Sequence, residues 1–98
     1  MELNLKIEQY EGPLDLLLAL ITKHKIDIFD IPIAEICEQY TAYLDAMRSL
    51  DMEIAGEFIV MAAELMLIKS RMLLPRQESA EDPRAPLVDA LLEHRRAQ

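Results

Sequence analysis

The stretch AGEFIVMAAELMLIKSRMLLP, from Ala55 to Pro75, decides how this chain folds. Its residues favour a helix, and placing them about 100° apart produces two apolar faces instead of one. One face contains Ile54, Phe58, Met61, Leu65, Ile68 and Met72, and the other contains Ala55, Ile59, Ala62, Ala63, Met66, Leu73 and Leu74. A small helical domain can use one such face for its core, so the second face is predicted to meet something else.

Only a narrow polar strip interrupts this apolar surface. The strip contains Glu53, Glu57, Glu64 and Arg71, with Lys69 isolated between the two faces. We expect the helix to begin at Asp51 and to end at about Leu74, because Pro75 stops it. The second face is rich in small alanines and adaptable methionines, which suit close packing against another helix. A partner interface is therefore favoured over simple burial or self-association.

Three segments before this helix carry the spacing of regular structure. Residues 3–7 alternate between apolar and polar side chains, which predicts a short strand. A helix that is apolar on all sides is predicted from Leu14 to about Lys23, after a proline in the first helical position. A second helix, from Ile33 onward, has a single apolar stripe, and Asp30 is its expected N-cap.

The last quarter of the chain has a different composition. The segment RQESAEDPRAP is polar and proline-rich, so it is predicted to be a linker. Residues 87–98 regain helical spacing but form a short segment, so we expect them to fold on a partner or to continue into further chain. The predicted fold is mainly α-helical. It comprises a three-helix domain with a short N-terminal strand in residues 1–75, then a linker and helix in residues 76–98.

Charge and cysteine content limit the classes of function. Eighteen acidic and ten basic residues give a formal net charge of -8, which repels phosphate backbones and anionic membranes. The single cysteine, Cys37, cannot form an internal disulfide, and the first residues lack the basic region of a signal peptide. The apolar runs are far shorter than the roughly 18 residues of a spanning helix. We therefore expect a cytoplasmic protein without direct nucleic-acid or membrane binding.

No arrangement of residues predicts catalysis. His24, His94 and Cys37 do not stand at the spacing of metal ligands, and the two glycines cannot build a phosphate-binding loop. Glu53 and Glu57 lie along the polar strip, where solvation explains them better than acid–base chemistry. The sequence therefore predicts neither an enzyme nor a bound metal or cofactor.

Several longer motifs resemble one known family. They are GPLDLLL at residues 12–18, DIPI at residues 30–33, EFIVMAAELMLIKSRMLLP at residues 57–75 and DPRAPLVDALLEHRR at residues 82–96. Together they resemble the N-terminal part of ScpA, the bacterial segregation and condensation proteins of the kleisin family. The resemblance runs from about residue 3 to the end of the chain, and it is specific because the motifs occur in combination.

The resemblance implies an adaptor without enzymatic activity. In this family the N-terminal helical domain adds its helices to the head-proximal coiled coil, or neck, of one SMC subunit. A C-terminal winged-helix domain caps the ATPase head of the other SMC subunit, and a ScpB dimer grips the middle segment. The resulting ring holds DNA for chromosome segregation, so the adaptor would reach the nucleoid through SMC. Family members continue well past this length, and residues 82–96 resemble the start of the ScpB-binding region.

The resemblance places the SMC-binding residues on the third helix. Combined with the helical spacing, it selects Ile59, Ala63, Met66, Ser70 and Leu73 on the second apolar face, with Lys69 at the rim. The sequence alone leaves open which apolar face points inward. A self-associating helical bundle, in which this face would be hidden in a homodimer, is the alternative.

Overall fold

A computed structural model describes residues 10–75 and 81–97, and every regular element in these two ranges is a helix. The elements are α1 (Pro13–Lys23), α2 (Ile33–Ser49), α3 (Gly56–Met72) and α4 (Ala85–Ala97). The prediction of a mainly α-helical fold is therefore confirmed. The strand predicted at residues 3–7 lies outside the described residues.

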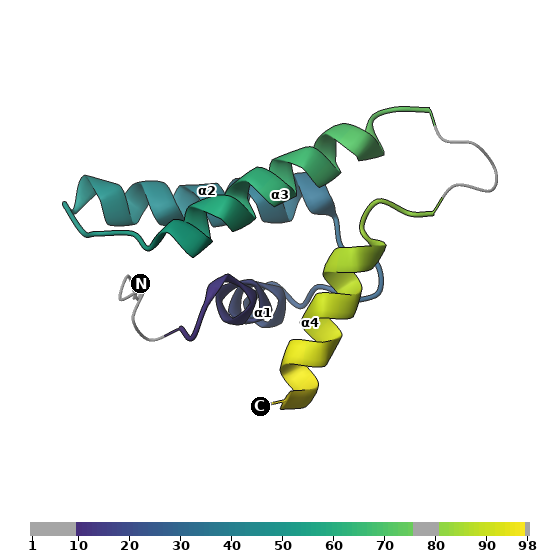
Figure 1. Cartoon of the computed structure of the whole chain (residues 1–98), viewed down its shortest axis with the longest axis horizontal. Coiled ribbons are helices and arrows are strands. Elements are labelled where there is room, and N and C mark those ends of the chain that lie inside the picture. Colours follow the sequence, from purple (N-terminus) through teal and green to yellow (C-terminus); the bar gives the residue numbers. More distant parts are fainter. Residues whose placement is uncertain (1–9, 76–80, 98) are drawn as a thin grey trace.

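The four helices are arranged around one core. Helices α2 and α3 lie alongside each other and run in opposite directions, while α1 lies against both of them (Figure 1). Helix α4 packs against α1 at the end of the bundle. Helix α1 begins as predicted, with Pro13 in its first turn and Asp15 at the positive end of the helix dipole. Its apolar circumference fits its central position.

The core takes side chains from all four helices. Its largest fully buried members are Tyr40, Leu16, Leu17, Ile31, Ile36, Met47, Leu65 and Leu91. Leu91 belongs to α4, the segment that was expected to fold on a partner or to continue into further chain. Together with Leu87 it is buried in the core of its own domain, so α4 folds by packing against α1.

Arg84, directly before α4, forms hydrogen bonds to the loop between α1 and α2. The Arg84 guanidinium donates to the Ile31 carbonyl oxygen at 2.7 Å and to Asp30 Oδ1 at 3.0 Å. It also pairs with Asp82, at 2.8 Å from Nη2 to Oδ2. These hydrogen bonds, chiefly the one to Asp82, raise the pKa of Arg84 above its ordinary value. The Arg84 side chain is only 18% exposed, so most of its charge is satisfied within the chain.

The predicted role of Asp30 is therefore wrong. No side chain caps α2, which starts at Ile33 after Pro32, and the Asp30 carboxylate accepts a hydrogen bond from Arg84 instead. The physical reason is a contact between segments that are distant in the sequence. Local spacing cannot reveal such a contact, because a capping residue and an ion-pairing residue are the same amino acid.

The predicted start of α3 at Asp51 is also wrong, since the helix begins at Gly56. Asp51 has a φ of 62° and terminates α2. Its N–H donates to the Arg48 carbonyl oxygen, and the Met52 N–H donates to the Met47 carbonyl oxygen at 3.1 Å. This is the hydrogen-bond pattern of a Schellman helix end, in which aspartate tolerates the left-handed conformation better than most residues do.

A buried tyrosine connects α2 to α3. The Tyr40 hydroxyl donates to the Phe58 carbonyl oxygen at 2.8 Å, and the Tyr40 side chain is fully buried. Burial raises the pKa of the hydroxyl above its ordinary range, with a smaller contribution from the nearby Glu57 carboxylate. Tyr40 therefore remains a neutral hydrogen-bond donor, and it holds the first turn of α3 against α2.

Candidate partner-binding face

The inner face of α3 is the one that completes the core. Phe58, Met61 and Leu65 are buried, and Ile68 and Met72 pack against them from partly buried positions. These five residues follow one another at intervals of three or four, so they form one continuous seam. The structure thereby answers the question that the sequence left open. Ala62, which the helical spacing placed on the second face, is buried as well.

The outer face of α3 contains all the predicted SMC-binding residues. Ile59, Met66 and Leu73 are exposed, and the Met66 side chain retains 52% of its accessible surface. Ala63, Ser70 and Lys69 are exposed too. The structure therefore places the whole set on solvent-accessible positions, five of them within α3 and Leu73 at its C-cap. Their binding role stays a prediction.

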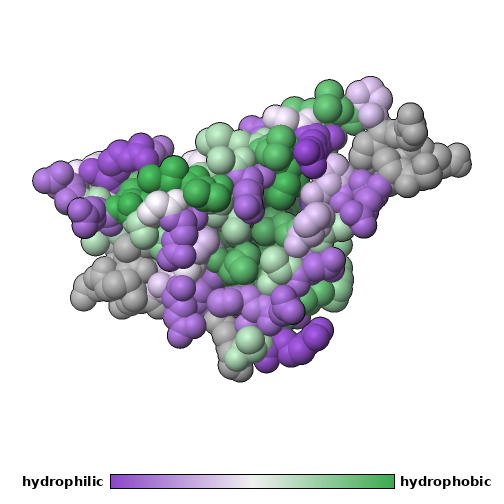
Figure 2. Space-filling model, in the orientation of Figure 1, coloured by the Kyte–Doolittle hydropathy of each residue, from purple (hydrophilic) through white to green (hydrophobic). Residues whose placement is uncertain are grey.

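Three further apolar residues lie on this side of the helix, Val60, Leu67 and Leu74, and all of them are more than half exposed. The helical spacing had placed Leu74 on the second face without including it among the binding residues, whereas Val60 and Leu67 were missed in the sequence. Each follows a predicted residue directly and recurs after seven positions, so the available signal was a heptad repeat within residues 56–74. Hydrophobic surface accordingly follows the line of α3 across the molecule, with hydrophilic side chains beside it (Figure 2).

The outer face consists of three parallel rows of residues. One row of large side chains contains Ile59, Met66 and Leu73, and a second contains Val60, Leu67 and Leu74. Between them lies a row of small residues, Gly56, Ala63 and Ser70. At 100° per residue the small row lies about midway between the two large rows. We call this combination the outer face of α3.

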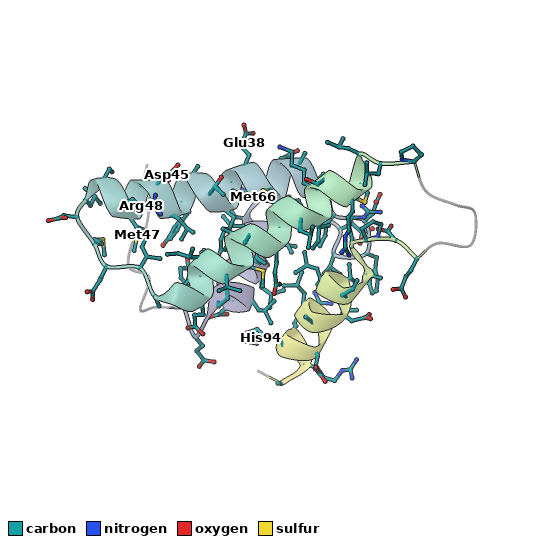
Figure 3. All side chains as sticks on the ribbon, turned by 45° about the horizontal axis from the view of Figure 1, so that its top comes forward. Glu38, Asp45, Met47, Arg48, Met66 and His94 are labelled. Atoms are coloured by element: carbon teal, nitrogen blue, oxygen red, sulfur yellow. The ribbon has the colours of Figure 1, made fainter. Side chains whose placement is uncertain are left out.

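A hollow between α2 and α3 borders the first large row. One part has a volume of about 520 Å³ and is lined by Ile59, Ala63 and Met66 from α3 and by Thr41 and Leu44 among others from α2. Met66 also lines the next part of the hollow, beside the α2 residue Glu38. Figure 3 shows Met66 between the two helices, near the charged side chains of α2. The first large row is thus continuous with a concave surface.

A second hollow borders the other large row. It has a volume of about 440 Å³ and lies between α3, α1 and the beginning of α4. Leu67, Ile68 and Leu87 contribute apolar surface to its lining, and Glu64 and Arg71 contribute charge. The outer face of α3 is therefore a ridge with a hollow on each side.

The rim of the outer face carries more acidic than basic side chains. On the α2 side these are Glu35, Glu38 and Asp45, and on the other side Glu64 lines the second hollow, with Glu57 exposed two turns before it in α3. The cations around the same rim are Arg48, Lys69 and Arg71. Arg48 already lies 3.7 Å from Asp45 within the chain. This excess of acidic over basic side chains favours a partner with basic side chains at the border of its interface.

The described residues offer little for other kinds of function. Residues 10–75 and 81–97 contain no group of three or more His, Cys, Asp or Glu side chains that could hold a metal ion. The Cys37 thiol is buried on the inner side of α2. Within the same ranges, no helix has the length and apolar character needed to cross a membrane. The outer face of α3 is therefore the candidate functional site.

Comparison with known proteins gives one consistent result. Residues 20–98 match the family model described as segregation and condensation protein ScpA. The segregation and condensation protein A of Enterococcus faecalis is 55% identical over 105 aligned positions, which cover 97% of this chain and 40% of the relative. The proteins of the same name from Bacillus licheniformis and Bacillus subtilis are each 52% identical, covering 98% and 97% of this chain and 42% and 41% of the relatives. The chain thus spans about two fifths of the length of these relatives.

Proposed function

Since the chain belongs to the ScpA family of segregation and condensation proteins, we propose that it acts as a non-enzymatic adaptor in a bacterial SMC–ScpA–ScpB complex. In this proposal the helical domain binds the head-proximal coiled coil of an SMC subunit. The adaptor thereby helps to bridge the ring that condenses and segregates the chromosome. It needs no cofactor or metal for this role, and DNA contact and ATP hydrolysis belong to SMC.

One observation carries the proposal. After α3 has supplied Phe58, Met61 and Leu65 to the core, its outer face still exposes two rows of large apolar side chains. Soluble monomers rarely leave contiguous apolar surface of this kind uncovered, and such surfaces mark sites of protein interaction. A coiled coil presents an apolar seam with the same heptad spacing, so it can cover both rows along the length of α3.

The proposed binding residues are Ile59, Ala63, Met66, Ser70 and Leu73, with Lys69 at the rim. Val60, Leu67 and Leu74 extend this set. Burying one large apolar side chain contributes about 1.5–3 kcal/mol before the costs of association. The two large rows together therefore supply enough favourable free energy for a specific complex.

The proposal also divides the chain by function. Residues 1–75 would bind SMC, and residues 76–98 would begin the ScpB-binding region. Because Leu87 and Leu91 are occupied in the core, a ScpB dimer that contacts α4 would use the outward side of this helix. In this arrangement SMC would contact α3 and ScpB would contact α4.

The experiment is isothermal titration of the chain into an SMC head fragment that carries its proximal coiled coil. Met66→Glu places a charge in the centre of the outer face, where burial of an unpaired carboxylate is costly, so we expect binding to be lost. Phe29→Glu is the matched control. Phe29 is an exposed apolar residue in the loop between α1 and α2, so the same change of charge is made away from α3.

The two variants separate the possible results. Circular dichroism should show that both remain folded, because both residues are exposed in the free chain. Binding by the wild type and by Phe29→Glu, with none by Met66→Glu, supports the proposed site. If Met66→Glu binds as tightly as the wild type, the site is wrong, and if the wild type does not bind, the proposed function is wrong.

A further inference from the structure

Helix α4 is attached to the domain less extensively than the other three helices are. Helices α1, α2 and α3 each pack against both of the other two, whereas α4 packs mainly against α1 (Figure 1). Within α4, Leu87 and Leu91 are the buried residues, and Val88 and Leu92 are partly buried beside them. The packing between α4 and α3 is incomplete, because the hollow of about 440 Å³ lies there.

The Arg84 side chain provides the polar part of this attachment. Asp82 belongs to the same segment as Arg84, so the hydrogen bonds that reach a distant part of the chain are those to Asp30 Oδ1, at 3.0 Å, and to the Ile31 carbonyl oxygen, at 2.7 Å. The Asp30 side chain is 78% exposed. Water and salt compete for a carboxylate this exposed, so its pairing with Arg84 is readily exchanged.

We propose that α4 is a releasable latch, which detaches from α1 as one unit when Arg84 leaves Asp30 and Ile31, while α1, α2 and α3 remain folded. Segments with few buried apolar contacts open locally at a lower free energy than the whole domain does. A helix of 13 residues is marginal in isolation, so the detached segment would lose much of its helical structure. The outer face of α3 would persist in the open state, because none of its residues belongs to α4.

The latch would give the adaptor an adjustable length. This consequence rests on the proposed function, in which residues 1–75 bind SMC and residues 76–98 begin the ScpB-binding region. The 13 residues of α4 span about 20 Å as a helix and about 45 Å when fully extended. Tension between the two partners would therefore open α4 before it unfolded the other three helices.

Amide hydrogen exchange of the whole chain, followed residue by residue by NMR, tests the latch. We expect the α4 amides to exchange together, at least about tenfold faster than the slowest amides of α1, α2 and α3. Arg84→Gln removes a charged hydrogen-bond donor and should accelerate exchange throughout α4 by about a further tenfold, with α2 and α3 unchanged. Arg48→Gln is the matched control. Arg48 is an exposed arginine that pairs with Asp45 within α2, so α4 should exchange as in the wild type.

A second variant tests the distant contact without changing α4 itself. Asp30→Asn removes the charge of an acceptor that lies 54 residues from Arg84 in the sequence, and it should also accelerate α4 exchange, by less than Arg84→Gln does. If the α4 amides exchange as slowly as the slowest amides of the other helices, α4 is a fixed part of the core and the latch is wrong. The latch is also wrong if Arg84→Gln accelerates exchange in α2 and α3 as strongly as in α4.

Titration into the SMC head and coiled-coil fragment separates this inference from the proposed function. Arg84→Gln should bind as tightly as the wild type, because the outer face of α3 persists when α4 opens. Loss of binding in this variant would show that α3 depends on an attached α4, which would contradict the latch. If the wild type does not bind, the proposed function is wrong, whereas the exchange measurements still decide whether α4 opens.

Discussion

The inner and outer faces of α3 have similar apolar side chains, but those of the inner face are buried and those of the outer face are exposed. Leu65 and Met66 are neighbours in the sequence, yet Leu65 is 0% exposed and Met66 is 52% exposed. Both faces repeat with a heptad period, so their apolar character does not distinguish them. The difference arises because α1 and α2 cover the inner face, whereas no described helix covers the outer one. Hydrophobicity therefore shows that a surface will be buried, but the neighbouring elements determine what buries it.

The use of the described helices explains why they leave the second face of α3 open. All four of them already contribute side chains to one core. Covering the outer face within the chain would need at least one further helix. In our account that helix comes from a partner. Helix α3 then contributes its inner face to the core and its outer face to the interface.

The largest effect should come from shortening a side chain on the inner face. We expect Leu65→Ala to lower the free energy of unfolding by about 2–5 kcal/mol, since it leaves a cavity in a fully buried site. Met66→Ala, one position away, should change it by less than about 0.5 kcal/mol because the side chain is exposed. Urea denaturation followed by circular dichroism measures both values. Similar losses in the two variants would contradict the assignment of the two faces.

A smaller loss of stability should follow from removing the Tyr40 hydroxyl, which connects α2 to the first turn of α3. Tyr40→Phe deletes the hydrogen bond to the Phe58 carbonyl oxygen, and we expect a loss of about 1 kcal/mol at neutral pH. The pKa of Tyr40 is raised in the folded chain, so the folded state retains its proton more strongly than the unfolded state does. The hydroxyl therefore contributes less to stability as the pH rises above the ordinary tyrosine value of about 10.

The same denaturation experiment, repeated at increasing pH, checks this dependence. The difference between the wild type and Tyr40→Phe should be constant near neutral pH and should shrink above about pH 10. Growth of the difference with pH would mean that the hydroxyl is not held as a neutral donor. Far-ultraviolet spectra provide the control, because both proteins should have the same helix content.

Much of this architecture was predictable from local patterns. The period of apolar residues identified α1, α2 and α3, and it separated the two faces of α3 with Phe58 and Leu65 on one and Ile59 and Met66 on the other. What it could not provide was the direction of each face. That direction depends on which face α1 and α2 cover, which is a property of the assembled bundle.

The errors at the helix ends have a common physical cause. Aspartate favours helix starts, but it also tolerates a left-handed helix end and forms ion pairs, so Asp51 and Asp30 fit several roles locally. In the structure Asp51 ends α2, and Asp30 accepts from Arg84 across 54 residues of sequence. The packing of α4 against α1 likewise depends on a distant part of the chain. Val60 and Leu67 were missed for a different reason, because their heptad repeat was present in the sequence but not used.

The measurement that tests the account most directly is an NMR spectrum of the methionine methyl groups, recorded with and without the SMC head and coiled-coil fragment. Met66 lies on the outer face of α3, while Met47 is fully buried in the core and serves as an internal control (Figure 3). We predict that the Met66 signal shifts or broadens on binding and that the Met47 signal keeps its position. A complex in which Met66 is unchanged while core or other surface methyl groups respond would contradict the claim that the outer face of α3 binds the partner.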